Sequence, residues 1–253
     1  MTTDALLNVL QHPHSVPARR ELAQVWLSQG VLQGELVDKQ VRERDGLGLK
    51  SQRAVLDRID ELIGKHGREW AGPIATLASR YHYELGLVAG VTLTGETFIQ
   101  RAGELVKVAP IVHLTLQPPI DLKALARVPE LGQMTTLAVR GGGPWLDDAS
   151  AEALAASPYV AGLRGLLLAN GAITAPGLAA LRSSPHLTDI VYILLTGNPC
   201  ARLLEKHNDD FYIVAASAEP RLREAYRQLT TGYDPMGQIT GWPPPSVELA
   251  YTD

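Results

Sequence analysis

The chain has 253 residues, of which 45% are hydrophobic and 20% are charged, and its net charge at pH 7 is −4. This composition provides for one large packed domain or two ordinary ones and excludes a disordered polymer. The lack of a basic excess argues against nucleic acid as a main partner. A single cysteine, Cys200, excludes an internal disulfide framework and a multi-cysteine zinc site.

The hydropathy pattern argues against a membrane protein. The sequence contains no run of about 18 apolar residues, and its first residues lack a positive segment followed by an apolar core. We therefore expect no membrane span, no signal peptide and a cytoplasmic location.

Residues 1–66 predict a small all-α domain. A short helix is expected over 5–11, where leucines recur at helical spacing before a His-Pro-His break. Ser15 then occupies the position of an N-cap, and the second helix is expected to end at Gly30.

Two more helices complete this domain. They are expected over 34–44 and 52–63, and Gly64 marks the predicted end of the second. Residues 67–87 carry no clear pattern and are interpreted as a connector.

The middle of the chain repeats. Pro129, Pro158 and Pro185 are 29 and 27 residues apart, and apolar residues recur around each proline at the same six offsets. The eighteen positions are Leu122, Ala151, Leu178; Leu125, Leu154, Leu181; Leu131, Val160, Leu187; Met134, Leu163, Ile190; Leu137, Leu166, Ile193; and Val139, Leu168, Leu195.

The offsets describe one structural unit. The last three form the pattern L-x-x-L-x-L of a short strand, and the first two lie three residues apart, as on a helix that the proline ends. The strand pattern also begins at Val88 and Ile111, and Phe98, Ala102 and Leu105 predict a helix between them. We therefore expect five units over 88–200, each burying its apolar edge against its neighbours.

The unit that begins at Ile190 reads Ile190-x-x-Ile193-x-Leu195-x-x-Asn198-x-Cys200. It resembles the leucine-rich repeats of the ribonuclease-inhibitor-like kind. The resemblance implies an α/β leucine-rich-repeat solenoid, with parallel strands on the concave face and helices on the convex face. It also implies that the Asn198 side chain bonds the backbone of adjacent turns and that Cys200 is a buried structural residue.

Residues 5–40 resemble the bacterial repeat-companion domain that often precedes such repeats. The matching residues are Ala18, Arg19, Trp26, Leu27, Gly30, Gly34, Glu35, Leu36, Val37 and Gln40. Ala23, Gln24 and Val25 depart from the family pattern, which has an aromatic residue, Ala and Asp there. This resemblance implies an architecture, a small all-α domain before the solenoid, and no chemistry.

The remaining residues, 201–253, are expected to form a C-terminal cap and a proline-containing tail. A capping strand is predicted over 211–215 and a helix over 219–229, because a solenoid needs a cover over its last apolar layer.

The sequence offers little catalytic chemistry. Asp147 and Asp148 are interpreted as the start of a helix over 150–156, where carboxylates oppose the helix dipole favourably. His82 and Glu84 are one strand period apart, a spacing compatible with metal ligation, but no third ligand is evident from the sequence. We expect no catalytic residue, no cofactor and no metal.

The strand residues between the buried ones predict a partner-binding face. The candidates are His113, Thr115, Gln117, Thr136, Arg140, Arg164, Leu167, Tyr192 and Leu194. A mixture of Tyr, Arg and Leu is typical of the centre of a protein interface. The apolar end at Val191, Tyr192 and Leu194 has a second interpretation, burial under the C-terminal cap.

The leading hypothesis is a non-enzymatic module that binds a partner protein through the concave face. The alternatives are a self-associating structural protein, with a homo-oligomer as the assembly, and a regulator of a partner enzyme such as a small GTPase.

Overall fold

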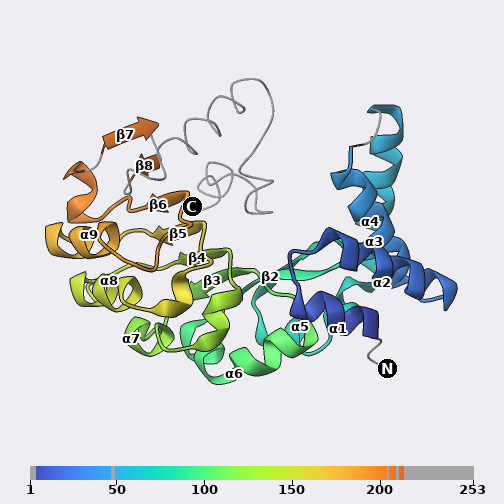
Figure 1. The fold of residues 1–253 in the computed structure, drawn as a ribbon, viewed down its shortest axis with the longest axis horizontal. Helices are drawn as coiled ribbons and strands as arrows, with labels where there is room; N and C mark the ends of the chain where they lie inside the picture. Colours follow the sequence, from blue (N-terminus) through green and yellow to red (C-terminus); the bar gives the residue numbers. More distant parts are fainter. Residues whose placement is uncertain (1–3, 47–48, 204, 209–210, 214–253) are drawn as a thin grey trace. The chain divides into compact units, whose positions relative to one another are not determined.

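The computed structural model describes residues 4–46, 49–203, 205–208 and 211–213. They form an α/β fold with a mostly parallel sheet and a helical N-terminal region (Figure 1). The described residues divide into two compact units. Unit 1 holds those of Met1–Leu93 and Arg101–Val112, and unit 2 holds those of Thr94–Gln100 and His113–Asp253. No helix among the described residues is both long and apolar enough to cross a membrane.

Unit 1 begins with four helices close to the predicted ones, α1 (Asp4–Gln11), α2 (Val16–Ser28), α3 (Gln33–Arg44) and α4 (Leu49–Trp70). The predicted N-cap is confirmed, because Ser15 Oγ accepts a hydrogen bond from the backbone N–H of Ala18, 3.2 Å away. Gly30 follows α2 with φ of 70° and turns the chain toward α3.

The predicted end of the fourth helix at Gly64 is wrong, because α4 continues to Trp70. A glycine inside a helix costs only about 1 kcal/mol relative to alanine. Packing offsets that cost, since Leu62 is buried in one apolar cluster with Leu36, and Ile63 and Trp70 pack against the same cluster.

The stretch expected to be a connector, 67–87, is part of the core of unit 1. It contains the end of α4, the short helix α5 (Ile74–Leu77), strand β1 (Arg80–Glu84) and the first residue of β2 (Leu87–Thr94). Leu85 and Leu87 are buried in the same cluster as Leu22 and Val37 of the helices. Because Val37 and Leu22 lie 48 and 63 residues before Leu85 in the chain, no local pattern reveals this role.

β1 and β2 pair antiparallel, and β2 leads into α6 (Gly95–Val108). Phe98, Ala102 and Leu105 are buried, as the predicted helix requires.

Unit 2 alternates strands and short helices. Its elements are β3 (His113–Gln117), α7 (Leu122–Leu125), η1 (Pro129–Gln133), β4 (Thr136–Val139), α8 (Asp148–Ala155), η2 (Pro158–Val160), β5 (Gly165–Leu168), α9 (Ala175–Arg182), β6 (Tyr192–Leu194), η3 (Pro199–Leu203), β7 (Glu205–Asn208) and β8 (Phe211–Ile213). β3, β4, β5 and β6 pair in parallel, and α7, α8 and α9 lie beside one another along them (Figure 1).

The predicted repeat pattern is confirmed as the buried core of unit 2. All eighteen apolar positions counted around Pro129, Pro158 and Pro185 are buried. The strand register pairs equivalent positions, for example Leu137 with Leu166 and Leu166 with Ile193. Pro129 and Pro158 each begin a 3₁₀ helix after the preceding α-helix has ended.

Only part of the predicted C-terminal region, 201–253, belongs to the described residues. β8 falls within the strand expected over 211–215 and pairs antiparallel with β6, where Ile193 lies opposite Tyr212. The helix expected over 219–229 and the proline-containing tail lie outside the described residues.

Candidate functional site

Side chains of β3 to β6 lie in rows across the sheet, because the strands are parallel and in register. Two rows on one face are His113, Thr136, Gly165, Tyr192 and Thr115, Ala138, Leu167, Leu194. Six of the nine residues predicted to bind a partner belong to these rows. The alternate positions on the other face carry the apolar repeat residues.

A chain of hydrogen bonds runs along the first row. His113 Nδ1 lies 3.2 Å from Thr136 Oγ1, and Thr136 is in turn hydrogen-bonded to the side chain of Tyr192. Gly165 of β5 lies between Thr136 of β4 and Tyr192 of β6, and a Cβ at Gly165 would overlap the phenol ring of Tyr192. The missing side chain therefore lets the tyrosine ring lie across β5 and reach Thr136.

Five of the nine residues predicted to bind a partner are buried, so the predicted open face is wrong for His113, Thr115 and Thr136, whereas burial of Tyr192 and Leu194 was the second interpretation of that end. The exposed fractions are 3% for His113, 2% for Thr115, 6% for Thr136, 4% for Tyr192 and 6% for Leu194. The tyrosine ring fills the space above Gly165, where a Cβ would otherwise lie.

Burial also changes the chemistry of Tyr192. It raises the pKa of the phenol above its ordinary value, and the hydrogen bond from Thr136 opposes this only in part. The hydroxyl is therefore a hydrogen-bonding group at neutral pH. With Val191 also buried, this end of the face is not an open apolar patch.

Four predicted residues keep more accessible side chains. Arg164 is exposed, and Gln117, Arg140 and Leu167 are partly buried. Gln117 ends β3 and Arg140 follows β4, so both lie at the carboxyl ends of parallel strands, whereas Arg164 immediately precedes β5. The accessible part of the predicted site is thus divided between the two ends of the strands.

Asn198 has the structural role that the repeat resemblance implies. Its Nδ2 donates to the carbonyl oxygens of Leu168 and Leu195, at 2.6 and 3.1 Å, and its Oδ1 accepts from the N–H of Ile173, at 3.1 Å. The side chain is buried and joins the turn after β6 to the turn after β5.

Cys200 follows in the same turn and is fully buried, with its backbone N–H donating to Ile173 O at 3.0 Å. Burial raises the pKa of its thiol, so the thiolate that a nucleophile requires is disfavoured.

A serine before each of two repeat prolines hydrogen-bonds to the preceding repeat, and we call this pair of bonds the serine ladder. The sequence analysis did not predict it. Ser157 Oγ donates to the carbonyl of Ala126, and Ser184 Oγ donates to the carbonyl of Ala155, both at 2.6 Å. Each acceptor lies at the end of the helix of the preceding repeat. The signal available in the sequence was the Ser-Pro pair at 157–158 and again at 184–185.

The two adjacent aspartates start helices in the structure. Asp147 caps α8 by accepting from the N–H of Ser150. Asp148 instead serves the next helix, because its carboxylate accepts from the N–H and hydroxyl of Thr174 and from the N–H of Gly177, at 2.6 to 3.0 Å.

Both carboxylates have a pKa below the ordinary value. For Asp147 the main cause is the backbone hydrogen bond from Ser150. For Asp148, burial raises the pKa, but the hydrogen bonds from Thr174 and Gly177 together outweigh it. Both groups are therefore charged helix caps at neutral pH.

Metal-ligating side chains occur in each unit. His82 and Glu84 lie on β1 of unit 1 and are partly buried. His113, a third residue of this type, belongs to unit 2, where it contacts Thr136.

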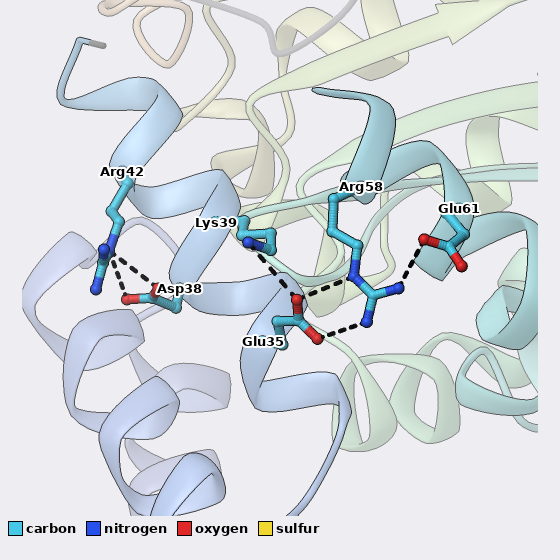
Figure 2. Close-up of polar contacts among 6 residues, drawn as sticks. All are labelled: Glu35, Asp38, Lys39, Arg42, Arg58 and Glu61. Atoms are coloured by element: carbon cyan, nitrogen blue, oxygen red, sulfur yellow. Dashed lines mark hydrogen bonds and ion pairs between the residues drawn. The ribbon is translucent and has the colours of Figure 1, made fainter. Parts of the chain in front are cut away.

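Figure 2 shows two groups of charged residues on α3 and α4. Glu35, Lys39, Arg58 and Glu61 form a connected network, and Asp38 and Arg42 form a separate pair on α3. Arg58 donates to both carboxylate oxygens of Glu35, at 3.0 and 2.9 Å, and to Glu61 at 2.7 Å. Lys39 extends the network on α3, with its Nζ 3.6 Å from Glu35. The hydrogen bond from Arg58 is the main reason that the pKa of Glu35 is lowered. Because Arg58 belongs to α4 and Glu35 to α3, their hydrogen bonds form an ion-pair clamp between the two helices.

No family model, no curated protein and no solved structure matches this chain.

Proposed function

We propose that this protein is a non-enzymatic protein-binding module. In this proposal, residues 88–200 form a leucine-rich-repeat solenoid, preceded by the helical repeat-companion-like domain. The partner protein binds the strand face through its accessible residues, Gln117, Arg140, Arg164 and Leu167.

The observation that carries the proposal is the repetition of contacts in unit 2. Equivalent apolar positions are buried, equivalent strand positions are paired, and the Ser157 bond to the preceding repeat recurs at Ser184. Repeats that stack on their neighbours create an extended surface on which side chains of successive units lie in rows, and repeat proteins use such surfaces to bind partners.

The charge of the accessible residues supports a partner with acidic groups. Arg140 and Arg164 both belong to the predicted face, and arginine is enriched at interfaces because its planar guanidinium pairs with two carboxylate oxygens at once. Buried Thr136 and Tyr192 then hold the strands together beneath the contact surface rather than touching the partner.

The test is affinity capture from the native host, followed by titration of the captured protein, made recombinantly, with purified variants. The double variant Arg140→Glu, Arg164→Glu should weaken binding at least tenfold, because two cations that contact the partner become anions. Tyr192 is unsuitable for substitution because it is buried.

A matched control is the double variant Lys123→Glu, Arg127→Glu, which changes the net charge equally at two exposed positions outside the strands. Equal binding by wild type and control, with loss in the strand-face variant, supports the proposal. Equal loss in both pairs, or none in the strand-face pair, overturns it. Circular dichroism verifies that each variant is folded.

Self-association is a second candidate, favoured by one observation in unit 1. Leu27, Val31 and Leu32 lie near the junction of α2 and α3 with 47%, 38% and 41% of their surfaces exposed. Light scattering over a hundredfold range of concentration tests it. A mass that rises with concentration and falls back in Leu27→Glu supports this candidate, and a constant monomer mass excludes it.

A further inference from the structure

The tip of the β1–β2 hairpin is buried, although hairpin tips ordinarily lie in solvent. Glu84 pairs with Leu87, so Leu85 and Gly86 are the two central residues of the turn. Leu85, Gly86 and Leu87 are all buried. A buried turn needs partners for its backbone polar groups, because each unsatisfied group costs free energy.

Side chains of α2 and α3 supply these partners. Gln40 Oε1 accepts from the N–H of Gly86 at 2.6 Å, and Gln33 Nε2 donates to the carbonyl of Gly86 at 3.1 Å. Arg19 Nη1 donates to the carbonyl of Leu85 at 3.5 Å. Three side chains from two helices therefore bind the two peptide groups of one turn.

Arg19 is itself buried for this task. The residue is 2% exposed, and its Nη2 donates to the carbonyl of Pro13 at 3.2 Å. Burial lowers its pKa to about 10, while the charge of Glu84 raises it. An arginine remains charged at neutral pH even so. Its Nη1 and Nη2 are directed to backbone carbonyls on either side, whereas its buried Nε has no hydrogen-bond partner among the described residues.

The close packing of the turn, α3 and α2 requires glycine at two positions. A Cβ at Gly86 would overlap the side chain and backbone of Val37. A Cβ at Gly34 would lie 2.8 Å from Trp26 Cβ, so Gly34 lets α3 approach α2 closely. The turn and the two helices are thus packed backbone against backbone.

The turn also has a conformation that leucine rarely adopts. Both central residues have positive φ, 49° at Leu85 and 82° at Gly86, as in the two-residue turns that favour Asn-Gly or Gly-Gly. Burial of the Leu85 side chain in the cluster of Leu22, Trp26 and Val37 compensates for this choice of residue.

We infer that α2 and α3 form a binding site for a two-residue, left-handed turn ending in glycine, and that the Leu85–Gly86 turn of this chain occupies it. The site consists of Arg19, Gln33, Gly34, Val37 and Gln40. All of these residues except Gln33 are among the residues that match the repeat-companion pattern, and the protein-binding proposal does not explain that match. The five site residues anchor the β1–β2 turn to the helices, and this inference is independent of the protein-binding proposal.

The first test compares two glycines with positive φ. Gly72 has φ of 53° and open space where a Cβ would lie, whereas the space at Gly86 is filled by Val37. Alanine at Gly72 should reduce the folding equilibrium constant about tenfold through backbone strain alone. Gly86→Ala should reduce it at least a further tenfold because it also separates the turn from α3. Equal effects in urea unfolding overturn the inference.

The second test reads the turn directly and does not require Gly86→Ala to fold. Amide hydrogen exchange by NMR should show the Gly86 N–H of the wild type as protected as that of paired Val88. Gln40→Leu removes the acceptor with little change of volume and should speed exchange at Gly86 at least tenfold more than at residues of α6. Gln11→Leu, at an exposed position, is the control and should leave Gly86 protected.

A Gly86 amide that exchanges as fast in the wild type as in an unstructured peptide overturns the inference. So does a Gly86 amide whose protection is the same in Gln40→Leu as in Gln11→Leu. Protection in the wild type that is lost selectively in Gln40→Leu supports it.

Discussion

The helices of unit 1 and the repeats of unit 2 are stabilised in different ways. In unit 2 the same contact recurs one repeat later, as Ser157 and Ser184 illustrate. In unit 1 the polar contacts that join one element to another link residues far apart in the chain, as the pair of Arg58 with Glu35 does. The difference teaches that repeated contacts are readable from periodicity, whereas contacts that occur once depend on the assembled fold.

The contrast is sharpest for the buried amide of unit 2. Replacement of Asn198 by alanine should lower the free energy of unfolding by about 3 kcal/mol, since it removes three buried hydrogen bonds and leaves the N–H of Ile173 and the carbonyl of Leu168 without their side-chain partner. Urea unfolding followed by circular dichroism measures this. Thr188→Ala, at an exposed position nearby, is the control and should change little. A loss below about 1 kcal/mol for Asn198→Ala would show that the Asn198 hydrogen bonds are not a main source of stability.

The serine ladder tests whether repeats are energetically equivalent. Ser157→Ala and Ser184→Ala should each cost about 1–2 kcal/mol, because each serine both bonds the preceding repeat and accepts from the N–H groups that follow it. The two losses should be similar, and the double variant should show their sum within about 0.5 kcal/mol. Losses that differ by more than twofold would break the comparison.

Acid should weaken unit 2 through Asp148. Its pKa in the folded protein lies below the ordinary value of 3.8, so its contribution to stability is complete above pH 3.8 and is lost as the pH falls through the lower folded pKa. At pH 7 the unfolding free energy of Asp148→Asn should therefore be lower than that of the wild type, by less than about 1 kcal/mol. This loss should shrink below pH 3.8. Asp189→Asn, at an exposed position, controls for the change of charge. A difference that grows toward low pH would contradict the cap.

The smallest effect is expected for the ion-pair clamp of unit 1. Arg58→Ala should lower the midpoint of urea unfolding at low salt, since Glu35 and Glu61 both lose their shared partner. Salt screens exposed charges, so the difference should decline in 1 M sodium chloride. The matched control is Arg53→Ala, an exposed arginine on the same helix. A salt-independent difference would indicate lost packing in place of lost charge.

Sequence patterns predicted the fold of unit 2 more closely than its surface. The period of apolar residues located β4, β5 and β6 and the helices between them, because burial of one face fixes the register of a strand. The same patterns wrongly placed Thr136 in the open and left the exposure of Tyr192 undecided. Gly165 of β5 lets the Tyr192 ring of β6 reach Thr136 of β4. This contact involves residues of three repeats, so the sequence of a single repeat does not predict it.

In unit 1 the patterns located the helices and the N-cap Ser15 but did not predict what the helices pack against. Ser15 and the apolar stripes are local signals, so α1, α2 and α3 were predicted to within one or two residues. The extension of α4 beyond Gly64 and the burial of Leu85 were not predicted. Both depend on apolar partners that folding brings from distant parts of the chain.

The sequence alone therefore determined the alternation of strands and helices and the apolar core of the repeats, which follow from local periodicity. The role of Asn198 in its turn was implied by the resemblance to leucine-rich repeats. Only the tertiary structure decided which strand residues are accessible and which side chains meet the Leu85–Gly86 turn. Those outcomes depend on distances between residues that are far apart in the chain, and such distances are set by packing, which leaves no local signature in the sequence.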